Sequence, residues 1–275
     1  CPTRELAIQV AEGFSDLLKY KKGIKVLPVY GGQSIERQLM TLRKGVQIII
    51  ATPGRLMDHL DRKTIKFDNV HTVVLDEADE MLNMGFIDDV EEIIKKTGSQ
   101  KRMLLFSATM PEKIISIAKK YMRNYEMLGV KKEQLTTNLT DQIYFEVSHA
   151  DKFDALCRII DFEHEFYGLI FCRTKIDVDS VANKLMERGY DADALHGDIA
   201  QNQREIILNK FRKQRINILV ATDVAARGID IHNLTHVINY SLPQDPEAYV
   251  HRIGRTGRAG KEGTAITFVT PDEYR

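Results

Sequence analysis

The chain has 275 residues, of which 43% are hydrophobic and 28% are charged, so its composition excludes a disordered or collagen-like protein. Its 39 basic residues equal its 39 acidic residues in number, and this balance gives no indication of a nucleic-acid partner. No apolar run is long enough to cross a bilayer, and the three widely spaced cysteines fit neither a disulfide framework nor a zinc site. This cysteine usage is typical of a reducing, cytoplasmic setting.

Short β-rich runs alternate with helical stretches along the chain. In the first half, apolar and β-branched runs predict strands at residues 25–30, 47–51, 72–76, 103–107 and 126–130. Helical length and periodicity predict helices at residues 34–44, 55–62, 85–96 and 112–122. In the second half, strands are predicted at residues 142–147, 168–172, 191–195, 217–222, 236–239 and 264–269. The alternation predicts an α/β protein with parallel sheets covered by helices on both faces.

The polar stretch 131–140 has no apolar periodicity and predicts a linker between a domain at residues 1–130 and a domain at residues 141–275. The two halves also share an internal repeat, in which a strand leads through a glycine turn and a helix to a strand that ends in Ala-Thr. One copy runs from Val29 to Thr52, and the other runs from Leu195 to Thr222, roughly 170 positions further along. The repeat predicts two similar α/β domains in tandem.

An apolar run ends in Asp76-Glu77-Ala78-Asp79, the Walker B arrangement of a nucleotide hydrolase. Parallel sheets bind ligands at the carboxyl ends of their strands, where Asp76 is expected to hold Mg²⁺, usually through water. Glu77 is expected to orient and deprotonate the water that attacks a γ-phosphate. Taken alone, the motif fits equally well a pair of acidic residues that begin a helix, where the helix dipole favours them.

Residues 251–258 have the sequence His-Arg-Ile-Gly-Arg-Thr-Gly-Arg, which is too basic and too rich in glycine for a quiet amphipathic face. Guanidinium groups offer planar forks to phosphate oxygens, and glycine lets the backbone approach a partner closely. Arginine supplied by a second domain against a transferring phosphate is an arginine finger. The alternative is a solvated basic loop, which this density of arginine and glycine disfavours.

Along its whole length the chain resembles a DEAD-box ATP-dependent RNA helicase. The resemblance rests on nine motifs in the family's order: Pro2-Thr3-Arg4-Glu5-Leu6-Ala7, Gly31-Gly32, Thr52-Pro53-Gly54-Arg55, Asp76-Glu77-Ala78-Asp79, Ser107-Ala108-Thr109, Phe171-Cys172-Arg173-Thr174, Gln201-x-x-Arg204, Thr222-Asp223-Val224-Ala225-Ala226-Arg227-Gly228-Ile229-Asp230 and the run 251–258. Ala78 and His251 favour this family over related helicases, which resemble it but use Gln and His at these motif positions. Residues 195–205 and 83–86 look most like the bacterial cold-shock type.

The resemblance implies two tandem RecA-like domains with ATP in the cleft between them. It assigns Asp76 and Glu77 to Mg²⁺ and the attacking water, and it assigns Arg255 and Arg258 to the phosphates. Asp230 matches a contact to the ribose, and Gly228 matches a backbone contact to the nucleotide. Ser107, Thr109 and His251 resemble side chains that couple the nucleotide to domain closure.

The resemblance also implies that RNA lies across the same face of both domains. The matching positions are Thr3, Arg4, Gly31, Gly32, Thr52 and Arg55 in the first domain and Arg173, Thr174, Gly197, Gln201, Arg204 and Thr222 in the second. Backbone amides, hydroxyls and arginines suit phosphate and 2′-hydroxyl contacts, so the expected binding is independent of sequence. Without the resemblance, Thr-Pro-Gly and Gly-Gly are also typical of plain turns and caps.

The chain departs from the family at its beginning, because no G-x-x-x-x-G-K-[ST] loop occurs anywhere in it. In the family that loop and an upstream glutamine motif precede the position of Pro2, so the first domain is expected to be N-terminally incomplete, with a sheet edge left open. Either the sequence is part of a longer protein, which the absent start methionine favours, or it is a truncated product. We expect such a segment to hydrolyse ATP poorly by itself.

The predicted function is ATP-dependent local separation of short RNA duplexes, with domain closure driven by ATP and RNA. Two alternatives stay open at this point. The chain could be an ATP-gated RNA clamp or scaffold that never unwinds, or a DNA-directed helicase of the wider superfamily.

Overall fold

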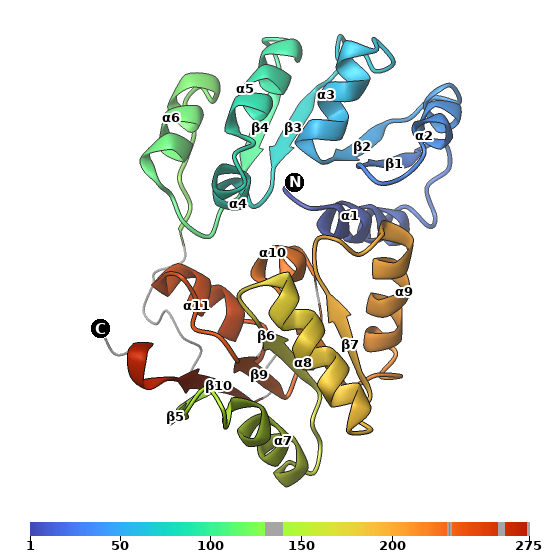
Figure 1. Cartoon of the computed structure of the whole chain (residues 1–275). Helices are drawn as coiled ribbons and strands as arrows, with labels where there is room; N and C mark the ends of the chain where they lie inside the picture. The colour runs from blue at the N-terminus through green and yellow to red at the C-terminus, as the bar shows by residue number, and fades with distance from the viewer. Residues whose placement is uncertain (130–139, 230, 232, 258–261, 274–275) are drawn as a thin grey trace. The chain divides into compact units, whose positions relative to one another are not determined.

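The computed structural model describes residues 1–129, 140–229, 231, 233–257 and 262–273 (Figure 1). The chain divides into two compact units: unit 1 comprises Cys1–Gly129 with Gly228–Asp230, and unit 2 comprises Val130–Arg227 with Ile231–Arg275. Among the described residues, no helix has both the length and the apolar character that a bilayer span requires. The predicted linker falls almost entirely outside the described residues, and Thr140 at its end is the first residue of a strand.

Unit 2 is built on a parallel sheet of six strands in the order β5-β10-β9-β6-β8-β7. The strands β6, β8 and β9 are buried at every residue, as expected of apolar runs in the middle of a parallel sheet. The elements of this unit are β5 (Thr140–Glu146), α7 (Lys152–Phe162), β6 (Gly168–Phe171), α8 (Lys175–Glu187), β7 (Ala192–Leu195), α9 (Gln201–Arg212), β8 (Ile218–Ala221), α10 (Asp223–Ala226), β9 (His236–Asn239), α11 (Pro246–Ile253), β10 (Gly263–Val269) and η1 (Pro271–Glu273).

Helices cover both faces of this six-stranded sheet. Apolar residues of α7 and α8 form one core cluster with Ile170, Val220 and Ile238, which share one face because side chains alternate along a strand. On the other face, the guanidinium carbon of Arg252 on α11 lies 4.9 Å from the ring centroid of Phe171. The predicted architecture of parallel strands between two helical layers is therefore confirmed in unit 2.

Unit 1 contains two separate pairs of parallel strands, β1 with β2 and β3 with β4. Its elements are α1 (Arg4–Leu17), β1 (Val26–Val29), α2 (Ile35–Leu42), β2 (Ile48–Ala51), α3 (Pro53–Asp61), β3 (Thr72–Leu75), α4 (Ala78–Asn83), α5 (Ile87–Lys96), β4 (Arg102–Leu105) and α6 (Glu112–Tyr121). Within the described part of the chain no ladder joins the two pairs, which agrees with the expectation of an incomplete sheet in the first domain.

The two strand pairs of unit 1 differ in how they are covered. Helix α1 packs on one face of β1 and β2, and α3 packs on the other. Helices α4, α5 and α6 cover only one face of β3 and β4. On the opposite face, Val74 is 50% exposed, Leu104 is 40% exposed and Phe106 is 55% exposed. The prediction of helices on both faces thus holds for β1–β2, but not for β3–β4 in the described residues.

The internal repeat is visible in the register of the strands. Val29 at the end of β1 pairs with Ala51 at the end of β2, and Leu195 at the end of β7 pairs with Ala221 at the end of β8. In both units the second strand is followed by a threonine, Thr52 or Thr222, and then directly by a helix. The repeat predicted from the sequence therefore corresponds to the same supersecondary unit in each half.

Some predicted boundaries and elements differ from the structure. Residues 126–129 form no strand, and Met127 and Leu128 are 61% and 84% exposed, because no neighbouring described strand pairs with them. In unit 1, helices α1 and α4 were not among the predicted helices, and no helix bounds were predicted for unit 2. Helix α4 has only six residues and begins within the acidic motif, at Ala78, so it is too short to give a periodic signal.

Candidate functional site

The acidic motif lies at the carboxyl end of β3, where parallel sheets place their ligands. Asp76 follows the last strand residue, and its Oδ1 atom accepts a hydrogen bond of 3.0 Å from the backbone N–H of Glu77. Glu77 has φ 50° and ψ 54°, a left-handed conformation that is unfavourable for a residue with a side chain. The chain therefore turns sharply between β3 and α4 at Glu77, the predicted general base.

Asp79 connects this motif to the segment after β4. Its backbone N–H donates to the hydroxyl of Ser107 at 3.1 Å, and its Oδ2 atom accepts from the backbone N–H and the hydroxyl of Thr109 at 2.8 Å and 2.9 Å. Burial disfavours the charged carboxylate, but the hydrogen bonds from Thr109 and Ser107 outweigh it, so the pKa of Asp79 lies below its usual value. Ser107 and Thr109 thus hold the turn that carries Asp76 and Glu77.

The chemistry of this strand end fits a magnesium ion that keeps much of its hydration. Asp76 and Glu77 are both partly exposed. The described residues contain no group of three or more His, Cys, Asp or Glu side chains that could enclose a metal ion. Mg²⁺ in nucleotide sites is commonly held by one or two carboxylates together with waters and substrate phosphates, so Asp76 is a sufficient protein ligand.

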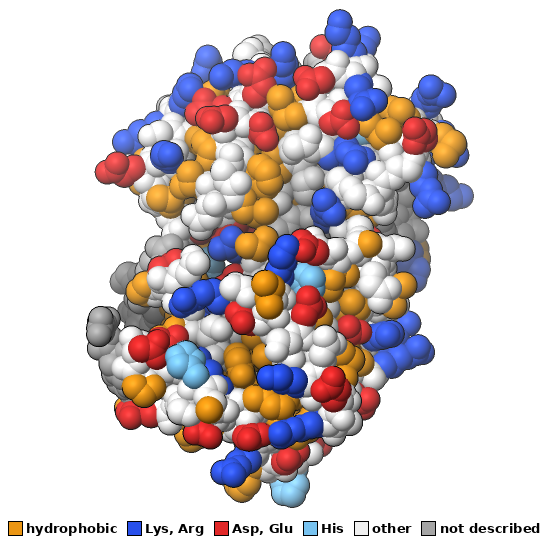
Figure 2. Space-filling view, in the orientation of Figure 1, with side chains coloured by type: hydrophobic (Ala, Val, Ile, Leu, Met, Phe, Trp, Pro, Cys, Tyr) orange, Lys and Arg blue, Asp and Glu red, His pale blue; other side chains and the backbone are white. Residues whose placement is uncertain are grey.

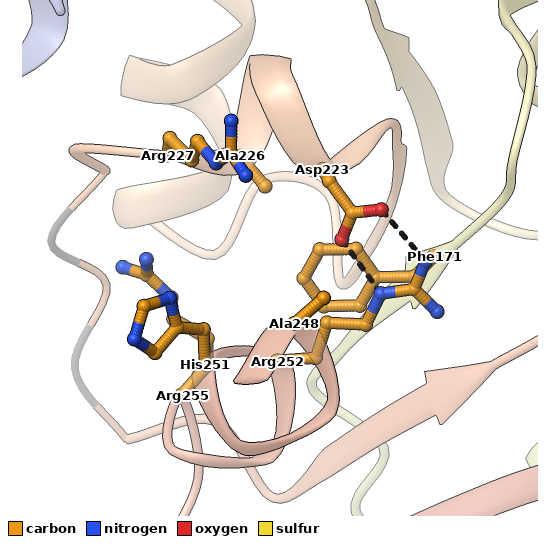
Figure 3. A pocket seen from close by; sticks show the side chains of 8 residues that line it. All are labelled: Phe171, Asp223, Ala226, Arg227, Ala248, His251, Arg252 and Arg255. Carbon is orange, nitrogen blue, oxygen red and sulfur yellow. Dashed lines mark hydrogen bonds and ion pairs between the residues drawn. The ribbon is translucent and has the colours of Figure 1, made fainter. Parts of the chain in front are cut away.

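A pocket in unit 2 contains the arginine-rich motif (Figure 3). Figure 3 shows Arg227, His251 and Arg255 on one side of the pocket, with Asp223 and Arg252 on the other. These side chains come from α10, from α11 and from the residues that directly follow each helix. The structure thus brings predicted His251 and Arg255 together, whereas predicted Asp230 and Arg258 lie outside the described residues.

Arg252 is anchored on several sides in this pocket and is only 2% exposed. It forms two parallel bonds to Asp223, of 2.6 Å from Nε and 2.7 Å from Nη2, and its Nη1 atom donates to Asn239 and to the carbonyl of Ser241. A buried guanidinium needs such a fork of acceptors to offset its desolvation. Because Arg252 fixes α11 against β9 and α10, it also fixes the positions of His251 and Arg255.

The predicted RNA contacts of unit 1 gather at the carboxyl ends of β1 and β2. We call residues 30–33 and 52–55 the β1–β2 end. Thr3 begins α1 and accepts a hydrogen bond from the N–H of Leu6, and a Cβ added at Gly31 would lie 3.5 Å from Nη2 of Arg4. Gly32 has φ 86°, which only glycine adopts without strain. Arg4, Gly31, Gly32, Thr52 and Arg55 are therefore neighbours in the fold.

The predicted contacts of unit 2 occupy the corresponding place. We call residues 196–199 and 222–225 the β7–β8 end. Gly197 follows β7, Thr222 follows β8, and Arg173 and Thr174 follow β6, whose Phe171 pairs with Ala221. Arg173 and Gly197 are exposed, whereas Gln201 and Arg204 are each only 7% exposed. Arg204 donates to the carbonyl oxygens of His196 and Ala225 at 3.1 Å and 3.3 Å.

Several residues with a supporting role were not among the predicted site residues, although Asp223 and Arg252 lie within two of the nine motifs. Gln38, His59 and Asn239 are buried polar residues, and Asp223 and Arg252 form a pair 29 positions apart. Polar residues at positions that face a core are the one signal that could have marked them, because buried polar groups need partners. The sequence indicates the polarity, but only the fold indicates the partner.

Positive and negative side chains are mixed over the face of the molecule shown in Figure 2. This agrees with the equal numbers of acidic and basic residues in the sequence. Any RNA contact is therefore expected to depend on local groups at the strand ends rather than on a broad basic surface.

Comparisons with known proteins agree with the motifs and the fold. The family described as DEAD/DEAH box helicase matches residues 1–117, and the helicase conserved C-terminal domain matches residues 151–260. The ATP-dependent RNA helicase CshA of Listeria monocytogenes is 53% identical over 272 residues, which are 99% of this chain and 52% of the relative. The chain thus spans about half the length of the curated relatives it matches.

Two solved structures are also similar. A DEAD box protein from the hyperthermophile Methanococcus jannaschii is 50% identical, with a TM-score of 0.54, over 100% of this chain and 74% of that one. Dbp5 of S. cerevisiae, solved bound to RNA and ADP BeF3, is 33% identical, with a TM-score of 0.86, over 98% of this chain and 70% of that one. On the strength of its motifs, its two α/β units and these relatives, the chain belongs to the DEAD-box helicase family and resembles the CshA helicases of bacteria.

Proposed function

We propose that this chain is the two-domain motor of an ATP-dependent RNA helicase that locally separates short RNA duplexes. The domains are residues 1–130 and 141–275, joined by a linker at residues 131–140, and ATP together with RNA drives them to close. The observation that carries the proposal is the repeated strand end. Each unit presents glycines, hydroxyls and arginines at the carboxyl ends of a matched pair of strands. A cytoplasmic location stays a prediction from the sequence.

ATP is the substrate and Mg²⁺ is the cofactor in this proposal. Asp76 holds Mg²⁺, most simply through water, and Glu77 orients the attacking water and accepts its proton. Arg255 and Arg258 bind the phosphates, and His251 couples to the same network. Asp230 contacts the ribose, and Gly228 approaches the nucleotide through its backbone. The hydrogen bonds of Asp79 to Ser107 and Thr109 support this assignment, because they hold the turn that carries both carboxylates.

RNA is bound through its backbone and without regard to base sequence. The groups available at both strand ends are amides, hydroxyls and guanidiniums, which suit phosphate oxygens and 2′-hydroxyls. The structure of Dbp5 bound to RNA is one relative that supports an RNA ligand. Among the proposed contact residues, Arg204 has its guanidinium already bonded to two backbone carbonyls.

The proposal includes a limited activity for the 275-residue chain by itself. The sequence contains no G-x-x-x-x-G-K-[ST] loop, which would supply the main grip on the β- and γ-phosphates. RNA-stimulated phosphate release should therefore be low for this chain and high for a protein that carries the chain together with that loop. Equal turnover by both would contradict this part of the proposal.

Glu77→Gln in the loop-containing protein tests the assigned chemistry. Hydrolysis should fall by roughly 10²–10⁴-fold because the base is lost, while ATP and RNA binding remain. Glu112→Gln is the matched control, since Glu112 is an exposed first-turn residue of α6. Normal turnover by Glu77→Gln would show that another group activates the water.

Strand separation is tested with short duplexes in the presence and absence of ATP. The proposal expects ATP-dependent release of one RNA strand, and a protein that binds RNA with ATP but releases no strand would be a clamp instead. Replacing the RNA by DNA of the same sequence should abolish stimulation of hydrolysis, because the 2′-hydroxyl contacts are lost. Equal stimulation by DNA would favour the DNA-directed alternative.

A further inference from the structure

Gln38 lies at the centre of a buried hydrogen-bond network in unit 1. It belongs to α2 and is 2% exposed. Its Nε2 atom donates to the carbonyl oxygen of Tyr30 at 3.0 Å, and its Oε1 atom accepts from Nη1 of Arg55 at 3.4 Å and from Nε2 of His59 at 2.9 Å. The amide orientation is self-consistent, because Tyr30 offers an acceptor while the guanidinium offers only donors.

His59 fixes the acceptor side of this amide. Its ring is fully buried, and its second nitrogen, Nδ1, lies 2.8 Å from the hydroxyl of Thr64. Burial and the nearby charge of Arg55 lower the pKa of His59, although Asp58 opposes them, so the ring is neutral at pH 7. A neutral ring that donates from Nε2 must accept at Nδ1, which the Thr64 hydroxyl satisfies.

Arg55 is thereby joined to the loop that follows β1. Its Nη1 atom also donates to the carbonyl oxygen of Gln33 at 3.1 Å, and its Nε atom lies 3.8 Å from Oδ2 of Asp58. The side chain of Arg55 is 15% exposed. Both bonds to the network use Nη1, and Nη2 has no partner among the described residues, so one edge of the fork remains available to a ligand.

Unit 2 has a residue in the same position with the opposite hydrogen-bonding character. Tyr30 and His196 each directly follow the first strand of the repeat, and Gln38 and Arg204 each lie eight residues further on. Gln38 bonds the carbonyl oxygen of Tyr30, and Arg204 bonds that of His196. Each side chain also bonds a residue just after the second strand, three positions beyond its threonine: Arg55 in unit 1 and Ala225 in unit 2. The same link therefore occurs twice.

We propose that Gln38 is a positioning residue for RNA binding, which joins the Gly31-Gly32 loop and Arg55 into one rigid contact surface. This inference rests on the proposed function, because it takes Arg55 as an RNA contact. Gln38 itself, being buried, touches no RNA and acts through Arg55. Arg204 makes the corresponding link at the β7–β8 end, where its two carbonyl bonds support Gly197 and Thr222 in addition to any contact of its own with RNA.

The test measures how the chain binds a labelled single-stranded oligouridylate at several salt concentrations. Arg55→Ala should weaken binding about three- to tenfold and reduce the slope of log affinity against log salt by about 0.7, the value for one phosphate contact to a single strand. Gln38→Leu should weaken binding by a similar factor and reduce the slope in the same direction, because the guanidinium is no longer held in place. A loss of folding alone would not change the slope.

A double-mutant cycle shows whether Gln38 acts through Arg55. Adding Gln38→Leu to Arg55→Ala should cause less than a twofold further loss, because the residue it positions is already absent. Gln38→Glu should retain most of the salt slope, since a carboxylate still accepts from Arg55 and His59 and loses only the bond to Tyr30. Ile94→Val, a core substitution in the same unit with a modest cost in stability, is the control and should bind RNA normally.

The outcomes separate the two claims. If Arg55→Ala weakens binding but Gln38→Leu is silent or fully additive with it, the positioning role of Gln38 is wrong and the RNA surface stands. If Arg55→Ala leaves affinity and slope unchanged, the proposed RNA contact fails, and the inference fails with it. Weakening by Ile94→Val equal to that by Gln38→Leu would assign the effect to stability and would also overturn the inference.

Discussion

Each copy of the repeat is stabilised from within by a buried side chain at the same position, but the chemistry of this side chain differs between the two copies. At the β1–β2 end the link is Gln38, a neutral amide that accepts from Arg55 and His59 and donates to Tyr30. At the β7–β8 end the link is Arg204, a charged side chain that donates to two backbone carbonyls. The difference follows from what the next helix supplies. Helix α3 brings a donor in Arg55, so the link must accept, whereas α10 brings only the carbonyl of Ala225, so the link must donate.

The same contrast extends to the rest of each unit. Unit 2 uses a second buried arginine, Arg252, to fix α11 through Asp223 and Asn239. Unit 1 holds its acidic turn with two hydroxyls at Asp79: the Thr109 hydroxyl donates to the carboxylate, and the Ser107 hydroxyl accepts from the backbone N–H. Buried charges are costly to leave unpaired, so substitutions in unit 2 are expected to cost more than their counterparts in unit 1.

The largest expected effect is that of Arg252→Ala. It leaves Asp223 without its partner and should destabilise unit 2 by about 3–5 kcal/mol. Urea unfolding with hydrogen exchange at the β8 amides would measure the loss. Arg188→Ala is the control: the side chains of its pair with Asp154 are 48% and 58% exposed, so the substitution should cost far less than Arg252→Ala. Equal costs for the two variants would refute the view that burial of the pair matters.

The next largest effect is expected for Arg204→Met. The apolar replacement removes the guanidinium donor from the carbonyls of His196 and Ala225, of which His196 keeps a bond from the N–H of Ile199, and should cost about 2–3 kcal/mol in the same measurement. Gln38→Met should cost less, about 1–2 kcal/mol, because it removes one donor from the carbonyl of Tyr30 and Arg55 can turn toward water. A larger loss for Gln38→Met would reverse the proposed comparison between the two strand ends.

Thr109→Val tests whether the Asp79 carboxylate stabilises unit 1 and whether this contribution depends on pH. Losing one hydroxyl donor to a charged acceptor should cost about 1–2 kcal/mol at pH 7. The pKa of Asp79 is lower in the folded protein than in the unfolded chain, where it is about 3.9. The charged carboxylate therefore stabilises unit 1 fully at pH values above the unfolded pKa. This contribution is lost as the pH falls through the lower folded pKa. The difference between wild type and variant should therefore shrink on acidification. A difference that stays constant down to pH 2 would show that the hydroxyl does not act through the charge.

The smallest effect concerns the two threonines that precede α3 and α10. Thr222 accepts a hydrogen bond from the N–H of Ala225 at 3.4 Å, whereas Thr52 makes no such side-chain cap. Thr222→Ala should cost about 0.5–1 kcal/mol of unfolding free energy, and Thr52→Ala should cost a few tenths at most. Equal losses at both positions would mean that the cap geometry does not distinguish the repeats.

Much of the fold could be predicted from the sequence, because it depends on local patterns. The continuous apolar runs at β6, β8 and β9 indicate central parallel strands, and the repeated Gly turn and Ala-Thr ending indicate the duplicated unit. The strand predicted at residues 126–130 was wrong over its described part, since an apolar run forms a strand only beside a partner. The sites of Asp230 and Arg258 stay predictions.

The supporting residues could not be predicted in the same way. Gln38 meets His59 across 21 positions and Arg252 meets Asp223 across 29, and neither pairing has a local signal. Such partners are fixed by which strand ends the topology brings together. Motifs indicate the residues that face a ligand, whereas the residues that hold them in place are visible only in the fold.

Hydrogen exchange of the chain with and without saturating single-stranded RNA tests the central claim most directly, because the claim is that RNA binds both strand ends. The account predicts slower exchange at residues 30–38 and 52–56 in unit 1 and at residues 196–204 and 222–226 in unit 2. Residues at the opposite ends of the same strands should exchange as before. Protection confined to the opposite ends, or to one unit alone at saturation, would contradict the account.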